Sequence, residues 1–199
     1  MLLAAAVLAA GLAGFWLAQQ LDRGGPRLAS GSWLPQPLTP ADFALTDGDG
    51  RTVNRAALRG VPTLVFFGFT QCPDVCPTTL AQLAAARRRA ALPRLRVLFV
   101  SVDPERDTAT LVGRYVHGFD PEFVGATGTP AQIAALAKGF GVAASRVVLP
   151  GGGYTMDHSA VVFLLDGSVR IAAVFTPPFE AAALAADLKR AAPYLGAAS

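Results

Sequence analysis

Cysteine, histidine and methionine are scarce in this chain of 199 residues, which holds two of each. Two cysteines are too few for a disulfide-rich scaffold. They are also too few for a structural zinc site with four thiolates. With so few thiols, cysteine usage does not indicate the cellular compartment, which has to be judged from the N-terminus.

A strong charge imbalance is also missing, since the formal net charge is +3 and the sequence pI is about 9.2. Most basic residues are scattered arginines, and this pattern does not predict a nucleic-acid partner. The one basic run, Arg87–Arg89, is expected near the end of a helix, where positive charge complements the helix dipole. A patch for an acidic partner is the alternative interpretation of this run.

The N-terminal segment Leu2–Leu21 lacks charged residues. Twenty helical residues span about 30 Å, the thickness of a bilayer core, so residues 1–21 are predicted to be a transmembrane anchor. A signal peptide, with its shorter apolar region, is the alternative. Residues 22–41 are rich in Gly, Pro and Ser and are predicted to be a flexible linker. The globular domain is then expected over residues 42–199.

The charges that flank the predicted anchor do not favour an outward-facing domain. Arg23 and Arg27 lie on its C-terminal side, so the positive-inside rule would keep the domain in the cytoplasm. This bias amounts to two residues. The chemistry of the site described below favours the outer side, and we expect the domain to face the periplasm.

Apolar strands alternate with helices through the middle of the chain, which predicts an α/β fold with a sheet covered on both faces. The expected elements are a hairpin over 43–54, strands over 63–69 and 95–102, helices over 80–91, 107–116 and 129–139, a short strand over 123–126, a hairpin over 160–175 and a closing helix over 179–192. Ligands of such sheets bind at the carboxyl ends of strands. Cys72 and Asp103 each follow a predicted strand.

The two cysteines, Cys72 and Cys76, lie where the strand over 63–69 turns into a helix. A helix N-terminus lowers the pKa of a thiol and favours the thiolate. In a helical turn, residues four apart lie on one face with Cβ atoms about 5–6 Å apart. Such a pair can bind one soft metal ion or close a disulfide. Two inert buried thiols are the alternative.

His158 lies between the glycine-rich loop over 150–153 and a buried strand. By itself it is a polar loop residue, but beside a cysteine pair it becomes a candidate third metal ligand. Thiolates select Cu(I), zinc or iron–sulfur clusters, and two thiolates with one imidazole suit Cu(I) best. A catalytic zinc ion with a bound water is the alternative. His117, at a predicted helix end, is assigned no role.

Three further residues near these ligands have competing interpretations. Met156 is a candidate thioether donor, although packing is the more frequent role of such a methionine. Asp157 is expected to be structural or to support a ligand, because adjacent strand residues point to opposite faces. Asp103 and Asp107 are interpreted as an ion-pair partner of Arg106 and a helix cap, with an acidic cation site as the alternative.

Three stretches, in order along residues 43–193, resemble the Sco/SenC family of copper-binding assembly factors for cytochrome c oxidase. They are 63–77 (TLVFFGFTQCPDVCP), 101–108 (SVDPERDT) and 154–159 (YTMDHS). The resemblance implies a thioredoxin-like fold, with a central mixed sheet flanked by helices, an added N-terminal hairpin and one preceding transmembrane helix. It also implies Cu(I) held by Cys72, Cys76 and His158 in a domain facing the periplasm or intermembrane space.

The resemblance implies a copper metallochaperone that assists maturation of the binuclear copper centre of oxidase subunit II, with Cu(II) as a further candidate ion. A thiol–disulfide oxidoreductase that reduces the cysteines of that subunit through Cys72 and Cys76 is the alternative. Against it, redox motifs usually have the spacing Cys-x-x-Cys. A peroxidase is a weaker third candidate, because Phe69 occupies the position of the threonine expected there.

The resemblance implies that this protein acts on subunit II of the oxidase. Another periplasmic copper chaperone or a thioredoxin-like reductase is a further candidate partner, and the N-terminal helix is expected to contact the membrane.

Overall fold

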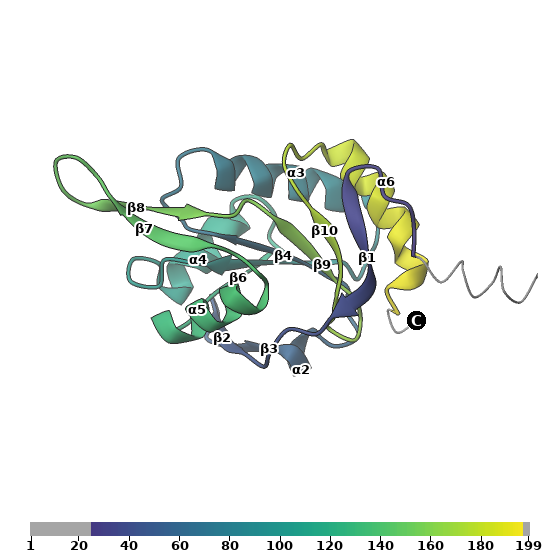
Figure 1. Cartoon of the computed structure of the whole chain (residues 1–199), viewed down its shortest axis with the longest axis horizontal. Helices are drawn as coiled ribbons and strands as arrows, with labels where there is room; N and C mark the ends of the chain where they lie inside the picture. The colour runs from purple at the N-terminus through teal and green to yellow at the C-terminus, as the bar shows by residue number, and fades with distance from the viewer. Residues whose placement is uncertain (1–24, 197–199) are drawn as a thin grey trace, which may run out of the picture.

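The computed structural model describes residues 25–196. A central sheet of eight strands has the order β1-β10-β9-β4-β5-β6-β2-β3, and β7 and β8 form a separate two-stranded sheet (Figure 1). The strands are β1 (Gly31–Leu38), β2 (Ala44–Asp47), β3 (Thr52–Asn54), β4 (Thr63–Gly68), β5 (Arg96–Ser101), β6 (Val124–Thr127), β7 (Ala144–Val148), β8 (Tyr154–His158), β9 (Val162–Leu165) and β10 (Ile171–Phe175). The helices are α2 (Arg55–Leu58), α3 (Val75–Ala90), α4 (Ala109–His117), α5 (Pro130–Gly139) and α6 (Ala181–Ala191), followed by the 3-10 turn η1 (Ala192–Tyr194).

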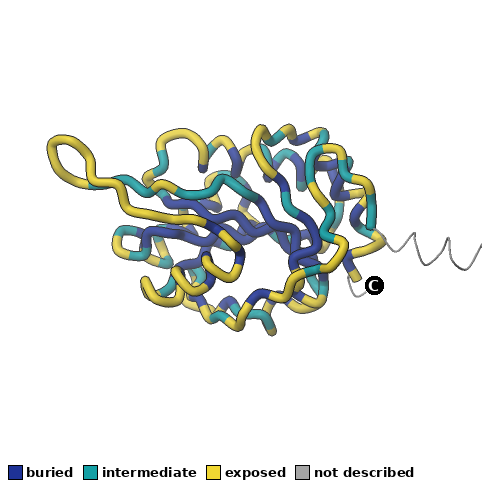
Figure 2. The backbone as a smooth tube through the Cα atoms, viewed as in Figure 1, coloured by how far each residue is buried: buried dark blue, intermediate teal, exposed yellow. Residues whose placement is uncertain are grey.

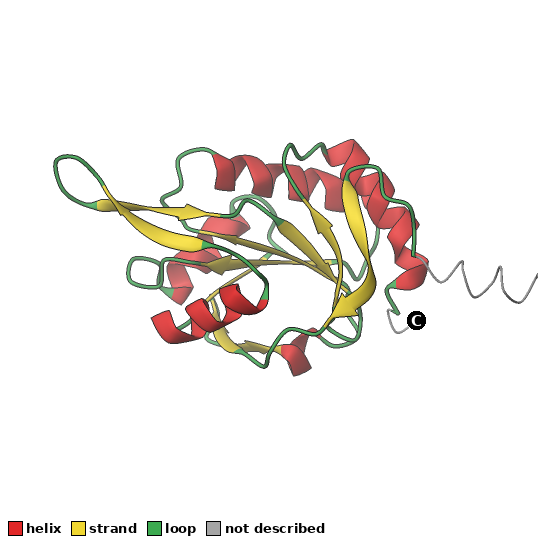
Figure 3. Cartoon of the chain, in the orientation of Figure 1, coloured by secondary structure: helices red, strands yellow, loops and turns green. Residues whose placement is uncertain are grey.

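The centre of the sheet is mixed, as the sequence predicts. β4 pairs in parallel with β5 and antiparallel with β9, while β5 pairs in parallel with β6. Every residue of β4 is buried, in keeping with its run of β-branched and aromatic side chains. Helices α3 and α6 lie together on one side of the sheet and α5 lies on the other (Figure 3). The predicted α/β class with a helix-flanked central sheet is confirmed.

The prediction of a flexible linker over residues 22–41 is wrong for much of that range. β1 lies at the edge of the central sheet and pairs antiparallel with β10, with Gly31 opposite Phe175. Just before it, the backbone N–H groups of Ala29 and Ser30 donate to the carboxylate of Asp187 in α6, at 2.7 to 3.0 Å. The folded domain therefore begins well before residue 42.

The composition of β1 explains why the sequence pattern does not predict this strand. Pro35 and Pro37 interrupt the strand. Proline has no N–H group to donate, and it is tolerated at the edge of a sheet because there the N–H side can face solvent instead of a neighbouring strand. The pairing register also shifts between Trp33 and Leu38. A strand of this kind lacks the alternating apolar pattern that identifies a half-buried strand from sequence.

The predicted membrane anchor, residues 1–21, lies outside the described residues. Between residues 25 and 196, none of the helices combines the length and apolarity needed to cross a bilayer.

The predicted N-terminal hairpin is confirmed as β2 and β3, which extend the sheet beyond β6. Two helix starts differ from the sequence prediction. α3 begins at Val75 rather than near residue 80. α4 is capped by Thr108, whose hydroxyl accepts the N–H of Leu111, so the prediction that Asp107 caps this helix is wrong.

The sequence analysis does not predict β7. This strand is exposed along its whole length and pairs only with β8, and the two form a hairpin that stands out from the body of the molecule (Figures 1 and 2). Gly151, Gly152 and Gly153 close the hairpin with positive φ angles, which glycine adopts without steric cost. Because β7 packs on no core, it has no apolar periodicity to identify it.

Candidate metal centre

The cysteine loop, residues 69–76, connects the buried strand β4 to α3. Its backbone is tightly turned, since the N–H of Cys72 donates to the carbonyl of Phe69 at 3.2 Å. The N–H of Cys76 then donates to the Sγ atom of Cys72 at 3.4 Å. The Cys72 sulfur therefore sits at the amino end of α3, where it accepts a backbone N–H of the first helical turn.

Cys76 lies in the first turn of α3 and is fully buried. Burial in apolar surroundings raises the pKa of the Cys76 thiol far above its ordinary value. The predicted lowering of thiol pKa by the helix start is thus wrong for Cys76, because the loss of hydration outweighs the dipole. In the metal-free protein this thiol is protonated, and a metal ion has to displace its proton.

Gly68, the last residue of β4, makes room for the Cys76 sulfur. A Cβ atom at this position would lie 2.6 Å from Cys76 Sγ and 2.7 Å from the ring of Phe99. Both distances are well inside van der Waals contact. Only glycine fits here without displacing the sulfur or the aromatic ring.

His158 is the last residue of β8 and reaches the cysteines from the protruding hairpin. Its Nε2 atom lies 3.4 Å from Cys76 Sγ, and its Nδ1 atom lies 3.3 Å from the carbonyl oxygen of Ser159. A carbonyl only accepts, so this contact assigns the proton to Nδ1 and leaves the Nε2 lone pair facing the sulfurs. The imidazole packs edge-on against the rings of Phe66 and Phe69.

Burial lowers the pKa of His158 below its ordinary value. The imidazole is therefore neutral at neutral pH, which is the form that binds metals.

The structure brings together the three side chains that the sequence singles out. The donor atoms of Cys72, Cys76 and His158 all lie within 4.8 Å of one another. An ion about 2.3 Å from each donor requires donors no more than about 4.6 Å apart, so shifts of a few tenths of an ångström close the site. The donor set fits one soft ion of low coordination number.

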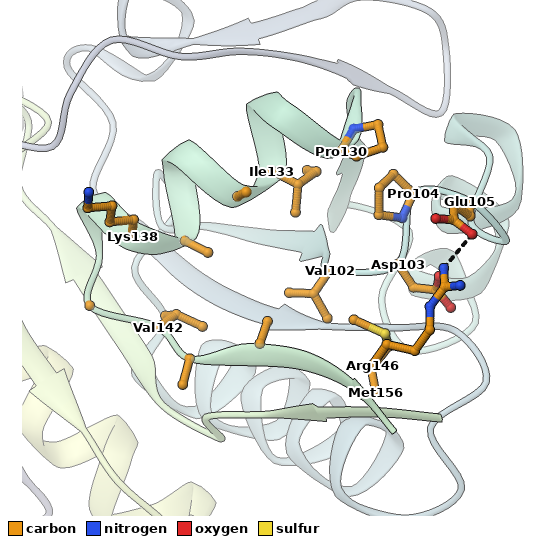
Figure 4. Close-up of a pocket in the computed structure, with 15 residues that line it drawn as sticks. Val102, Asp103, Pro104, Glu105, Pro130, Ile133, Lys138, Val142, Arg146 and Met156 are labelled. Carbon is orange, nitrogen blue, oxygen red and sulfur yellow. Dashed lines mark ion pairs between the residues drawn. The ribbon is translucent and has the colours of Figure 1, made fainter. Parts of the chain in front are cut away.

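The other candidates from the sequence lie outside this group. Asp157 is exposed, and His117 is exposed at the end of α4. Met156 packs against the core and lines a cavity of about 470 Å³ between α5 and the hairpin, where its side chain lies near Val102 (Figure 4). Packing, rather than ligation, is what the structure shows for Met156.

The segment between β5 and α4 contributes residues whose roles the sequence analysis misses. Asp107 is fully buried and accepts three hydrogen bonds. They come from the backbone N–H of Thr70 at 2.9 Å, the hydroxyl of Thr70 at 2.5 Å and the hydroxyl of Ser101 at 2.6 Å. Asp107 therefore anchors the cysteine loop to the end of β5. The predicted ion pair between Asp103 and Arg106 is confirmed.

Comparisons with known proteins agree with this geometry. The sequence profile of the SCO1/SenC family matches residues 34–193. The chain is 37% identical over 177 residues to the mitochondrial SCO2 homolog of Bos taurus, in a match covering 83% of this chain and 65% of that protein. Among solved structures, Bradyrhizobium japonicum ScoI with copper bound has a TM-score of 0.70 and 41% identity, covering 76% of this chain and 98% of that one.

Arabidopsis thaliana ScoI, also with copper bound, has a TM-score of 0.74 and 32% identity, covering 78% of this chain and 98% of that one.

Proposed function

The chain belongs to the SCO1/SenC family, and on this premise we propose that it is a copper metallochaperone that holds Cu(I) through Cys72, Cys76 and His158. The observation that carries the proposal is the convergence of two sulfurs and one imidazole nitrogen within 4.8 Å. Solved family members with 41% and 32% identity to this chain contain copper. Cu(I) favours soft thiolate ligands and accepts low coordination numbers, which this donor set supplies.

The exposure of the three ligands suits a protein that transfers its ion to a partner. Cys76 is buried, but Cys72 and His158 are each partly exposed. An incoming thiolate or imidazole of a partner can displace the exposed ligands one at a time while Cys76 keeps hold of the ion. The neutral form of His158 keeps its Nε2 lone pair available to bind the ion.

For the biological setting, we propose delivery of copper to subunit II of cytochrome c oxidase, for the maturation of its binuclear copper centre. The family resemblance supports this role. We further propose that residues 1–21 anchor the chain to the membrane, that the domain faces the periplasm, and that another periplasmic copper chaperone or a thioredoxin-like reductase supplies copper or electrons.

Thiol–disulfide exchange is the second candidate function, and the arrangement of the sulfurs favours it. Both cysteines are free, with Cys72 the more exposed. In this reaction the Cys72 thiolate attacks a disulfide of subunit II and forms a mixed disulfide. Cys76 then loses its proton and attacks Cys72, which releases the partner as a dithiol and leaves this protein oxidised by two electrons. The attack by Cys72 that begins the exchange makes no use of His158, whose Nε2 atom lies 3.4 Å from Cys76 Sγ.

The substitution His158→Ala separates the two functions. We expect it to abolish tight Cu(I) binding in competition against a chromophoric Cu(I) chelator, because two sulfurs alone leave the ion one ligand short. We expect the rate of disulfide exchange with a model disulfide to stay largely unchanged. Cys72→Ser, which removes a ligand needed by both functions, is the control that loses both. Equal Cu(I) affinity of the wild type and His158→Ala would refute the ligand assignment.

A further inference from the structure

The hairpin that carries His158 has few backbone ties to the rest of the protein. Its strands pair with each other, over Ala144 to Val148 and Tyr154 to His158, and not with the central sheet. One strand, β7, is exposed throughout (Figure 2). At the base of the hairpin, His158 lies four residues before Val162 of β9, which pairs with Phe66 of β4. The rest of the hairpin, toward its glycine tip, has no pairing with the sheet, and side-chain contacts have to hold it in place.

Several of these contacts surround Tyr154, at the start of β8 and next to the glycine tip of the hairpin. Its ring lies between two guanidinium groups, with the Cζ atom of Arg106 3.8 Å and that of Arg146 3.9 Å from the ring centroid. Its hydroxyl donates to Asp103 Oδ1 at 2.8 Å. Arg146 in turn pairs with Glu105 (Figure 4). Tyr154 thus joins the hairpin to the loop that follows β5.

Arg106 links the two halves of the metal centre. Its Nη1 atom donates to the side-chain oxygen of Gln71 at 3.2 Å and to the backbone carbonyl of Tyr154 at 2.9 Å. Gln71 directly precedes the ligand Cys72, and Tyr154 lies on the same strand as the ligand His158. The Nε atom of Arg106 pairs with the buried carboxylate of Asp103, which fixes the direction of the guanidinium plane.

From these contacts we infer that Arg106, stacked on Tyr154, is a positioning residue that holds the cysteine loop and the histidine hairpin at the separation one Cu(I) ion requires. The inference rests on the proposed function. Tyr154 lies about 13 Å from His158 along an extended strand, and the His158 end of that strand continues into β9. The contacts of Arg106 fix the other end of the strand, and with it the direction in which the imidazole leaves the backbone. A turn of the strand would take Nε2 away from an ion bound to the sulfurs.

The test is a double-mutant cycle on the full chain, with Cu(I) affinity measured by chelator competition. Arg106→Met removes both bridging hydrogen bonds and the stack on Tyr154 while keeping a long apolar stem. We expect it to weaken Cu(I) binding by about 10- to 100-fold, the usual effect of losing a group that orients a ligand. In the His158→Ala background the same substitution should change the affinity by less than about 3-fold, because no imidazole remains to be positioned.

A second variant and a control keep the test decisive. Tyr154→Leu removes the stacking ring without leaving the Asp103 carboxylate unpaired, and it should reproduce the loss of affinity if Arg106→Met does not fold. Arg170→Met is the matched control, because Arg170 also pairs with a buried carboxylate, that of Asp166, but in the turn between β9 and β10. We expect this control to leave Cu(I) affinity unchanged.

Two structural measurements complete the experiment. X-ray absorption of the copper-loaded Arg106→Met protein should show the loss of the imidazole contribution with both sulfurs retained. Hydrogen exchange of the copper-free variant should be faster at the amides of β8 than in the wild type. If Arg106→Met and Tyr154→Leu both bind Cu(I) within about 3-fold of the wild-type affinity, this inference is overturned and the proposed function stands. The same holds if Arg106→Met loses equal affinity in the wild-type and His158→Ala backgrounds. A wild type that fails to bind Cu(I) would instead overturn the proposed function and the inference with it.

Discussion

The two halves of the metal centre are built in opposite ways. The cysteine half is β4 and α3, where every strand residue is buried and Cys76 lies in the core. The histidine half is a separate hairpin, in which β7 is exposed and the side chains of Arg106 and Tyr154 hold the end opposite His158. The proposed copper chaperone has to bind its ion firmly and then release it. For that proposed function, the contrast between the halves assigns retention to the cysteine half and the ligand that can withdraw to the histidine half.

The largest effect that would test this contrast is on folding stability. Leu80 in α3 is fully buried among the core residues. We expect Leu80→Ala to lower the free energy of unfolding by about 2–5 kcal/mol, the cost of a lost apolar group and the cavity that it leaves. Denaturant unfolding followed by circular dichroism measures this value. A loss below about 1 kcal/mol would show that the cysteine half is not the rigid half.

Gly68 tests the packing around the buried sulfur itself. Gly68→Ala places a methyl group against Cys76 Sγ and the Phe99 ring. We expect a loss of about 1–3 kcal/mol in the free energy of unfolding through overpacking. We also expect weaker Cu(I) binding, because the sulfur has to move. Gly60→Ala makes a useful comparison, because its Cβ would meet no neighbour, although the positive φ angle there adds strain of its own. Unchanged Cu(I) affinity in Gly68→Ala would contradict this account.

The pH dependence of stability in the copper-free protein follows from the raised pKa of Cys76. Below the ordinary cysteine pKa of about 8.5, the folded and unfolded chains both hold the thiol proton, and this group adds no pH dependence. Above it, the unfolded chain releases the proton while the folded chain keeps it. The free energy of unfolding should then fall by up to about 1.4 kcal/mol per pH unit.

Thermal unfolding at a series of pH values from 7 to 10, run on the wild type and on Cys76→Ala, isolates this contribution. The slope above the ordinary cysteine pKa should be shallower in the variant. Identical slopes would mean that the Cys76 thiol is not protected from ionisation by its burial.

The smallest effect is expected at the tip of the hairpin. Val148 is 74% exposed, although it lies on the hairpin that carries His158. We expect Val148→Ser to change the free energy of unfolding by less than about 0.5 kcal/mol, as for surface substitutions in general. Cu(I) affinity should also be unchanged, because Val148 pairs with Tyr154 through the backbone. A marked loss of affinity would show that the Val148 side chain, and not only the contacts of Tyr154 and Arg106, positions the imidazole.

Much of the fold follows from local patterns in the chain. The strand over 63–69, the helix over 129–139 and the hairpin over 160–175 are all predicted correctly as β4, α5 and the β9–β10 pair, because each depends on neighbouring residues. The strands β1, β7 and β8 are missed for the converse reason. β1 is a proline-containing edge strand held by β10, and β7 and β8 pair with each other in a hairpin outside the central sheet, so none of the three has a local apolar period.

The sequence by itself determined the chemistry available to this protein: two thiols at a strand-to-helix turn and one imidazole beyond a glycine-rich loop, in a pattern that resembles a copper-binding family. Only the tertiary structure decided that these donors meet, that burial keeps the Cys76 thiol protonated, and that Arg106 and Asp107 tie the ligand-bearing segments to the end of β5. The reason is physical. Residue types and spacing set which bonds a side chain can form, whereas distance, burial and hydrogen-bond partners depend on segments that lie more than 80 residues apart in the chain.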